Sequence, residues 1–379
     1  YQAFSAFAGN PYLVSPQRLV EDGLLDPSDL AGASFPQDRV DYGAVIPFKN
    51  QLLRRAWERF QSGRGGALKP AFERFAHDEA KWLDDYALFM AIKDSQQGRS
   101  WAEWPEPARL RQDAYLKKAR TELANEIGLQ QFRQCLFFRQ WDAIKTYANE
   151  RGVQIIGDIP IFVSADSADV WANPHLFALD INRRPKLIAG VPPDYFSATG
   201  QLWGNPHYDW DAMLKARFAW WIDRFRATFR MVDMVRLDHF RGFQAYWEIP
   251  AGSPNAIKGR WVEAPGKALL TTLKQTFQSL PIIAEDLGVI TPEVDALRRD
   301  FDLPGMRILQ FAFSGGADNR FLPHNYDFNT VVYTGTHDND TTWGWYRTTA
   351  EHERDHLRRY LARDGSDVAW DLIRTAWSS

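Results

Sequence analysis

The 379 residues suffice for a single barrel domain with insertions, and 45% hydrophobic and 25% charged residues are ordinary for a globular protein. The net charge of −3 gives no electrostatic reason to expect a nucleic acid or an anionic membrane as partner. No apolar run reaches the ~20 residues of a membrane span, and the single cysteine, Cys135, excludes an internal disulfide and a cysteine-rich metal site. A cytoplasmic location is therefore expected.

Aromatic residues are unusually frequent, with 16 Trp and 14% aromatic residues in total. Many of them stand beside Gly, Pro, Asn and Asp instead of within regular core patterns. Aromatic faces in loops suit the C–H faces of sugar rings, and large core side chains are the alternative explanation. The chain also begins at Tyr1 within a dense segment, so we expect it to be a fragment of a longer protein.

Residues 15–150 have a helical pattern. Ser15 and Pro16 predict a helix start, and Gly23 predicts its end. Further helices are expected over 52–60 and 82–93. A final helix carries apolar side chains at helical spacing and ends at Gly152; these are Phe137, Trp141, Ile144 and Ala148. We expect a helical insertion subdomain at 15–130, followed by barrel βα units at 131–379, within one catalytic domain.

After Gly152, short apolar segments alternate with helical ones. A long loop is expected after the first strand, followed by a helix with Leu214, Phe218, Trp221 and Phe225 on one face. Another helix is expected around Leu269–Leu280, and Thr291-Pro292 opens a third. The predicted strands cover residues 153–163, 231–238, 281–285, 306–313 and 330–335.

This alternation predicts parallel βαβ units. Polar residues such as Asp158 gather where the strands end, which is typical of a (β/α)₈ TIM barrel. A doubly wound sheet is the alternative, but no glycine-rich phosphate loop follows the first strand. A closed barrel has eight strands, so the five predicted here indicate an α/β TIM barrel that is incomplete in this chain.

The strand ends carry acidic residues of the kind that glycoside chemistry requires. A retaining enzyme uses one carboxylate as nucleophile and a second, ~5–5.5 Å away, as acid and base. Asp238 lies two residues after Arg236, so strand periodicity places both side chains on one face. The guanidinium is expected to lower the pKa of Asp238, which suits a nucleophile. A purely structural Arg–Asp pair is the alternative.

Two further acidic motifs follow. Glu285 ends an apolar strand, where lost solvation favours the protonated form of a general acid. A structural strand-end glutamate is the alternative, and Asp286 should point to the other face. Asp338 follows His337, and this pair suits contacts to sugar hydroxyls. A metal site formed with Asp340 is another interpretation, but no complementary cluster supports it, and we expect no metal or cofactor.

Taken together, these motifs resemble those of amylomaltases, the disproportionating 4-α-glucanotransferases of glycoside hydrolase family 77 in the α-amylase clan. The similarity covers nearly the whole chain. Its most specific segments are the three carboxylate motifs and residues 1–12, 157–163, 189–196 and 201–206. The resemblance implies that Asp238 is the nucleophile, Glu285 the acid/base and Asp338 the stabiliser of the transition state.

The resemblance also implies substrate contacts and a missing part of the barrel. Residues 251–261 are similar to the family's flexible loop over the cleft. About two strands before Tyr1, and a last strand with helices after Trp377, are absent relative to the family. The implied substrate contacts come from Arg236, His337, Asp194 and Trp203, with Tyr1 and Phe311 as candidate aromatic walls.

The expected activity is transfer of α-1,4-glucan segments between malto-oligosaccharides through a glycosyl–aspartate intermediate. Two alternatives stay open at this point. An α-amylase-type hydrolase would use the same carboxylates, and a truncated chain could act as a non-catalytic glucan-binding protein.

Overall fold

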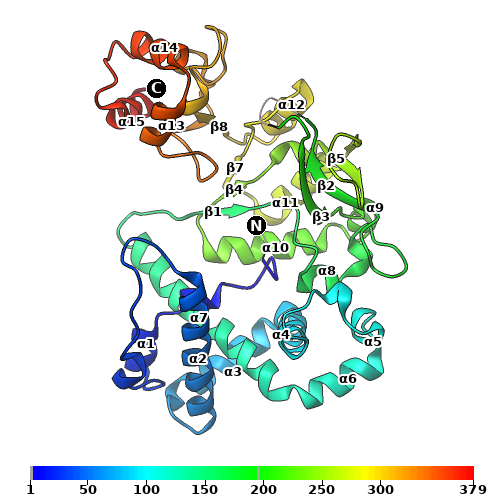
Figure 1. Cartoon of the computed structure of the whole chain (residues 1–379). Coiled ribbons are helices and arrows are strands. Elements are labelled where there is room, and N and C mark those ends of the chain that lie inside the picture. Colours follow the sequence, from blue (N-terminus) through cyan, green and yellow to red (C-terminus); the bar gives the residue numbers. More distant parts are fainter. Residues whose placement is uncertain (1–2, 194–196) are drawn as a thin grey trace. The chain divides into compact units, whose positions relative to one another are not determined.

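Helices make up most of the first 150 residues, as the sequence predicts (Figure 1). The hydroxyl of Ser15 caps the first helix by accepting a hydrogen bond from the Arg18 N–H at 3.4 Å, and Gly23 follows this helix with a φ of 71°. The predicted helix start and stop are therefore confirmed. The helices are α1 Pro16–Glu21, α2 Tyr42–Gln61, α3 Lys69–Asp78, α4 Ala80–Ser95, α5 Glu106–Arg109, α6 Asp113–Glu122 and α7 Ala124–Asn149.

Helix α7 is the longest element and packs against α2 and α4. Its buried residues all lie between Leu129 and Phe138. The predicted apolar stripe is therefore only partly right, because Ile144 is 56% exposed. The helix also runs through the expected boundary at 130/131, and the division into a helical insertion and barrel units stays a prediction.

This computed structural model describes residues 3–193 and 197–379. It divides into two units, each assembled from segments that are far apart in the sequence. Unit 1 consists of Tyr1–Ile155, Phe162–Val232 and Trp247–Arg260, and unit 2 consists of Ile156–Ile161, Asp233–Tyr246 and Trp261–Ser379.

Each of the five segments predicted as strands contains a strand, and all belong to unit 2. Three of them form a parallel sheet in the order β1-β4-β7, and the other two pair in parallel with each other. The α/β character is thus confirmed, whereas a barrel and its completeness stay predictions. The strands are β1 Ile156–Ile159, β4 Met234–Leu237, β7 Ile282–Ala284, β8 Gly305–Ile308 and β9 Thr330–Tyr333.

Four further strands were not predicted. They form a sheet in the order β3-β2-β5-β6, in which β2 is antiparallel to β3 and to β5. The expected long loop after residue 163 was therefore wrong, because two strands lie within it. Their short sequences do not show the alternation of polar and apolar residues that identifies a strand; β2, for example, is apolar throughout. The bounds are β2 Leu187–Val191, β3 Gln201–Pro206, β5 Ala245–Pro250 and β6 Arg260–Glu263.

The predicted helix with Leu214 and Phe225 on one face is also wrong, because it consists of two helices. Arg217 and Phe218 have φ values of 50° and 54°, which interrupt the helix, and Leu214 is 49% exposed. The helices expected around Leu269 and after Thr291 are confirmed. The remaining helices are α8 Ala168–Ala172, α9 Trp210–Lys215, α10 Ala219–Met231, α11 Gly266–Phe277, α12 Pro292–Asp300, α13 Thr342–Thr348, α14 Glu351–Leu361 and α15 Val368–Ser378.

Each unit has its own apolar core. In unit 1, Leu52, Trp57 and Phe132 belong to the core between the helices, and in unit 2, Leu309 and Phe313 belong to one that includes side chains of α14 and α15. Within residues 3–193 and 197–379, none of the helices has the length and apolar character that a membrane span requires.

Candidate active site

The strand register of unit 2 places two carboxyl groups side by side. Arg236 of β4 pairs with Ile283 of β7, and Leu237 pairs with Ala284. Asp238 and Glu285 are the next residues of these strands, so they leave the sheet at the same level. Neighbouring strands lie about 4.8 Å apart. The register therefore brings together two carboxyl groups that are 47 residues apart in the sequence.

Arg236 connects two carboxylates on one face of this sheet. Its Nη1 lies 2.8 Å from Oδ1 of Asp238 and 2.9 Å from both carboxylate oxygens of Asp158, with which it pairs across β1 and β4. The guanidinium is only 12% exposed. The expected proximity of Arg236 and Asp238 is confirmed. The role of Asp158 as second partner was missed, although its position at the end of a predicted strand was a usable signal.

The pKa of Asp238 differs from the sequence-based expectation. Burial raises the pKa of this carboxyl above its ordinary value, Arg236 opposes the increase, and the negative charges of Asp158 and Asp338 add to it. The predicted lowering is therefore wrong as a net result, because the loss of solvation outweighs the effect of one guanidinium that is shared with Asp158. A raised pKa keeps Asp238 more basic than an ordinary aspartate.

Glu285 is held by two main-chain donors. Its Oε2 accepts a hydrogen bond from the His239 N–H at 2.8 Å, and its Oε1 accepts one from the Leu287 N–H at 2.8 Å. His239, which directly follows Asp238, has a left-handed φ of 50°. Burial, followed by the charge of Asp238, raises the pKa of Glu285 to about 7. The expected increase is confirmed, and Glu285 is poised to donate or accept a proton near neutral pH.

Asp286, the next residue, faces a different environment. It is fully buried, accepts a hydrogen bond from the Met306 N–H at 2.7 Å, and lies 2.8 Å from Arg320 and 3.3 Å from Arg307. A third guanidinium, that of Arg298, lies 3.7 Å away. These contacts attach the end of β7 to the beginning of β8. Asp286 was expected only to point away from Glu285, and its arginine partners were not predicted.

The loop after β9 carries the third predicted carboxylate. Asp338 and His337 are exposed, and the His337 Nε2 lies 3.5 Å from Asp338 Oδ1. The negative charge of Asp338 contributes to the raised pKa of Asp238, so the two groups are within electrostatic reach. Asp238 therefore interacts electrostatically with Glu285, which follows β7, and with Asp338, which lies in the loop after β9.

Two of the remaining predicted substrate contacts, Phe311 and Trp203, lie within the described residues. Phe311, in unit 2, is partly buried and its ring packs edge-on against Phe321, with centroids 5.4 Å apart. In unit 1, the indole N–H of Trp203 donates a hydrogen bond to Gln201 Oε1 at 3.1 Å. Tyr1 and Asp194 lie outside the described residues. The roles of all four in substrate binding stay predictions.

Residues 251–261, expected to form a covering loop, connect β5 to β6 and end within β6. In unit 1, the indole N–H of Trp247 donates a hydrogen bond to the Ala256 main-chain oxygen at 2.9 Å, and Arg260 forms an ion pair with Glu248 at 2.7 Å. In unit 2, the Trp261 ring lies 3.7 Å from the Arg241 guanidinium. The part of the chain that the structure describes contains no group of three or more His, Cys, Asp or Glu side chains arranged to hold a metal ion.

Comparison with known proteins identifies the same family as the sequence motifs. The family described as 4-alpha-glucanotransferase matches residues 1–379. The 4-alpha-glucanotransferase of Thermus thermophilus is 51% identical over 100% of this chain and 77% of its own length. The enzyme of the same name from Synechocystis is 49% identical, over 100% of this chain and 76% of its own length.

Solved structures of two amylomaltases are also similar to this chain. An amylomaltase from Streptococcus agalactiae in complex with acarbose has a TM-score of 0.95 and 38% identity, over 100% of this chain and 77% of that chain. An amylomaltase from Corynebacterium glutamicum, 21% identical with a TM-score of 0.75, shares the fold over 99% of this chain and 51% of that chain.

Proposed function

The chain belongs to the 4-alpha-glucanotransferase family, and on that premise we propose that Asp238, Glu285 and Asp338 carry out a retaining transfer of α-1,4-glucan segments. The observation that carries this assignment is the strand register, which places Asp238 beside a Glu285 whose pKa is about 7. One ionised and one protonated carboxyl side by side are what a retaining double displacement requires.

In the first step, a carboxylate oxygen of Asp238 attacks the anomeric carbon of the donor. The bond from that carbon to the leaving glucan oxygen breaks, and Glu285 gives its proton to this oxygen. Asp338 stabilises the positive charge that develops on the sugar ring. Arg236, which contacts Asp238 at 2.8 Å, holds the nucleophile in place.

In the second step, the 4-hydroxyl of an acceptor glucan attacks the same carbon. Glu285 takes the proton of this hydroxyl, and the ester bond to Asp238 breaks. The anomeric configuration is retained because it is inverted twice. Transfer exceeds hydrolysis when an acceptor sugar occupies the site and water is excluded, a role that we assign to residues 251–261 and to aromatic side chains such as Trp203.

The ligands that we propose are α-1,4-glucans and malto-oligosaccharides, with contacts from Arg236, His337, Asp194, Trp203, Tyr1 and Phe311. The complex of the Streptococcus agalactiae relative with acarbose supports a ligand site in a protein of this fold. We propose no nucleic-acid or membrane partner, because the net charge is only −3. We also propose a cytoplasmic location, which the single cysteine suits.

Trapping the covalent intermediate tests the proposal. A fluorinated donor sugar that forms the ester but is released slowly should leave one glycosyl group on Asp238, located by mass spectrometry of peptides. A folded preparation without the adduct would favour a non-catalytic glucan-binding protein. Incubation with maltotriose separates the other alternative, because a transferase makes glucose and longer oligomers whereas a hydrolase increases the number of reducing ends.

A further inference from the structure

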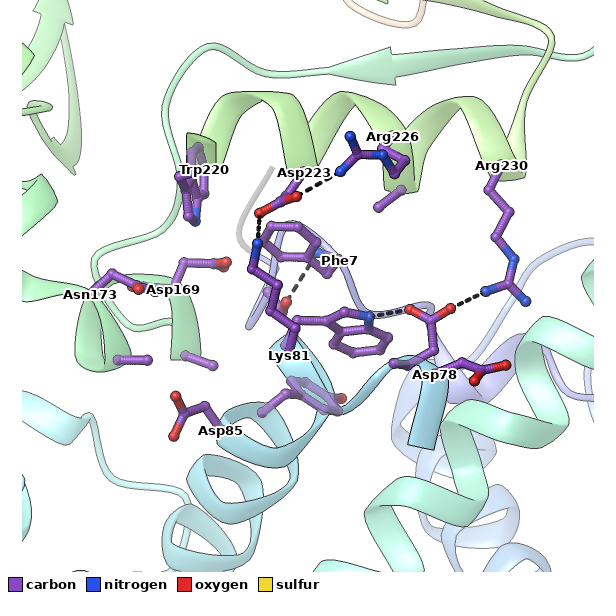
Figure 2. Close-up of a pocket in the computed structure, with 17 residues that line it drawn as sticks. Phe7, Asp78, Lys81, Asp85, Asp169, Asn173, Trp220, Asp223, Arg226 and Arg230 are labelled. Carbon is purple, nitrogen blue, oxygen red and sulfur yellow. Dashed lines mark hydrogen bonds and ion pairs between the residues drawn. The ribbon is translucent and has the colours of Figure 1, made fainter. Parts of the chain in front are cut away.

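Unit 1 contains a cavity that has no part in the catalytic proposal (Figure 2). Its volume is about 400 Å³, and its walls come from residues 5–7, the end of α3, the beginning of α4, α8 and α10. Small-molecule sites typically measure ~300–1,000 Å³. The cavity is therefore large enough for a small ligand, and all the residues that line it belong to one unit.

Aromatic rings form one part of the lining. Phe7 stacks on Trp82 with centroids 6.3 Å apart and meets Trp220 edge-on at 5.9 Å. Trp220 is 8% exposed, and its indole N–H has no hydrogen-bond partner within the described part of the chain. A buried donor without an acceptor is unfavourable. The aromatic side thus offers ring surface to a ligand.

The charged groups around the cavity are largely paired with one another. Asp223 contacts Lys81 at 2.5 Å and Arg226 at 2.8 Å. The Glu79 carboxylate accepts a hydrogen bond from the indole N–H of Trp82 at 2.6 Å and contacts Arg230. A strongly charged ligand would have to displace these partners. A neutral ligand with many hydroxyl groups fits better, because ionised side chains form strong hydrogen bonds to hydroxyls without losing their counterions.

Asp169 adds an acceptor to the lining of the cavity. It is 4% exposed, and its Oδ2 accepts a hydrogen bond from the Ala6 N–H at 2.8 Å. Figure 2 shows its carboxyl group directed into the space between Trp220 and Lys81, with Asn173 nearby. Burial raises the pKa of Asp169 to about 6. The cavity therefore combines a flat apolar surface with donors and acceptors on several sides.

We propose that this cavity is a second, non-catalytic binding site for a neutral sugar ring, namely a glucose unit of a malto-oligosaccharide. The sugar class follows from the lining, because C–H faces pack on aromatic rings while hydroxyls bond to Asp169 and Lys81. The choice of glucose rests on the proposed function. Such a site would bind one glucose unit of a glucan independently of the catalytic groups.

Filling the cavity tests the proposal without removing a native polar group. Ala227 lines the cavity from α10, whereas Ala219 is exposed on the same helix and does not line it. Calorimetric titration of Asp238→Asn protein with maltotriose should show two classes of site. Adding Ala227→Phe should weaken one class by roughly tenfold to a hundredfold, because inserted volume displaces the ligand. Adding Ala219→Phe should leave both classes unchanged.

A spectroscopic measurement places the ligand. In protein labelled with ¹⁵N-tryptophan, the indole signal of Trp220, assigned with Trp220→Phe, should shift as maltotriose or methyl α-glucoside is added. It should not shift in Ala227→Phe. Sorbitol, which has no ring, should have no effect.

Several results would overturn the proposal. These are equal binding by Ala227→Phe and Ala219→Phe, an unchanged Trp220 signal, or a shift caused by spermidine and not by sugar, which would indicate a cation site instead. Failure of the catalytic assignment would appear separately, as turnover of maltotriose by Asp238→Asn, and the methyl glucoside titration would still test the cavity.

Discussion

The catalytic carboxyl groups at the strand ends of unit 2 and the charged groups around the cavity of unit 1 differ in how they are paired with cations. At the strand ends, Arg236 contacts both Asp158 and Asp238, and Glu285 is held by main-chain N–H groups. In the cavity, a single carboxylate, that of Asp223, has two cationic partners, Lys81 and Arg226. Burial raises the pKa values of Asp238 and Glu285 above their ordinary values, so these carboxyl groups can transfer protons. Balanced pairs keep their charges and are suited to binding.

The largest effect that tests this contrast is expected for Asp238→Asn. Removing the nucleophile should reduce glucose release from maltotriose by at least about 10³-fold, while binding of maltotriose in the active site stays largely intact. Asp300→Asn is a matched control, since Asp300 forms an exposed pair with Lys267. Normal turnover by Asp238→Asn would show that another residue is the nucleophile.

Glu285→Gln distinguishes proton transfer from a structural role. With maltotriose as donor, the loss should be roughly 10²–10⁴-fold, as is usual for removal of a general acid. The first-turnover release of fluoride from a glucosyl fluoride should decrease much less, because fluoride leaves without needing a proton. An equal loss with both donors would argue against the acid role.

Asp286→Asn tests whether the neighbouring carboxylate is structural. Its removal leaves Arg298 and Arg307, both 3% exposed, without their buried counterion. The free energy of unfolding should fall by about 3–5 kcal/mol, measured by denaturant titration. Asp223→Asn, which affects the partly exposed pair with Lys81, should cost at most about 1 kcal/mol. A similar loss in both variants would contradict the contrast between the two regions.

A smaller effect than that of Asp286→Asn is expected for the pH dependence of stability. Glu285 has a pKa of about 7 in the folded state and 4.5 ordinarily. Because the folded protein binds this proton more tightly, its contribution to stability is complete below pH 4.5 and is lost as pH rises through 7. Relative to Glu285→Gln, wild-type protein should lose about 1–3 kcal/mol over this range. A constant difference between the two proteins would mean that the pKa is not raised.

The pH dependence of the catalytic rate should be set by the ionisation of Glu285 and Asp238. Donor cleavage needs protonated Glu285 and ionised Asp238, so the rate should fall as pH rises through about 7. It should also fall at low pH, beginning above the ordinary aspartate value, because the pKa of Asp238 is raised. In Glu285→Gln the alkaline decrease should disappear, and its persistence would assign the decrease to another group.

Much of the strand-end site was predictable. The apolar segments before Asp238, Glu285 and Asp338 identified three strands and the carboxylate that follows each. The period of two along β4 identified Arg236 as a neighbour of Asp238. These features are local, and a strand and the residue that ends it are set by a few consecutive side chains. Helix starts such as Ser15-Pro16 were predictable for the same reason.

Other features depended on which distant segments meet. The sheet containing β2 and β5 was missed because its strands are stabilised by pairing and not by a clear pattern of their own. The break at Phe218 was missed because a fully buried aromatic residue tolerates an unfavourable φ there. The cavity lined by Phe7, Trp82 and Trp220 joins three segments more than 70 residues apart, which no single motif indicates.

By itself, the sequence determined the alternation of strands and helices, the acidic residues that follow three of the strands and the family to which the chain belongs. Only the tertiary structure decided the ionisation of those residues. Burial and neighbouring charges act over distances in space, so they raise the pKa of Asp238 despite Arg236 and leave Asp286 enclosed by arginines next to Glu285. The order of residues along a chain does not state how much water or which charge surrounds each carboxyl group.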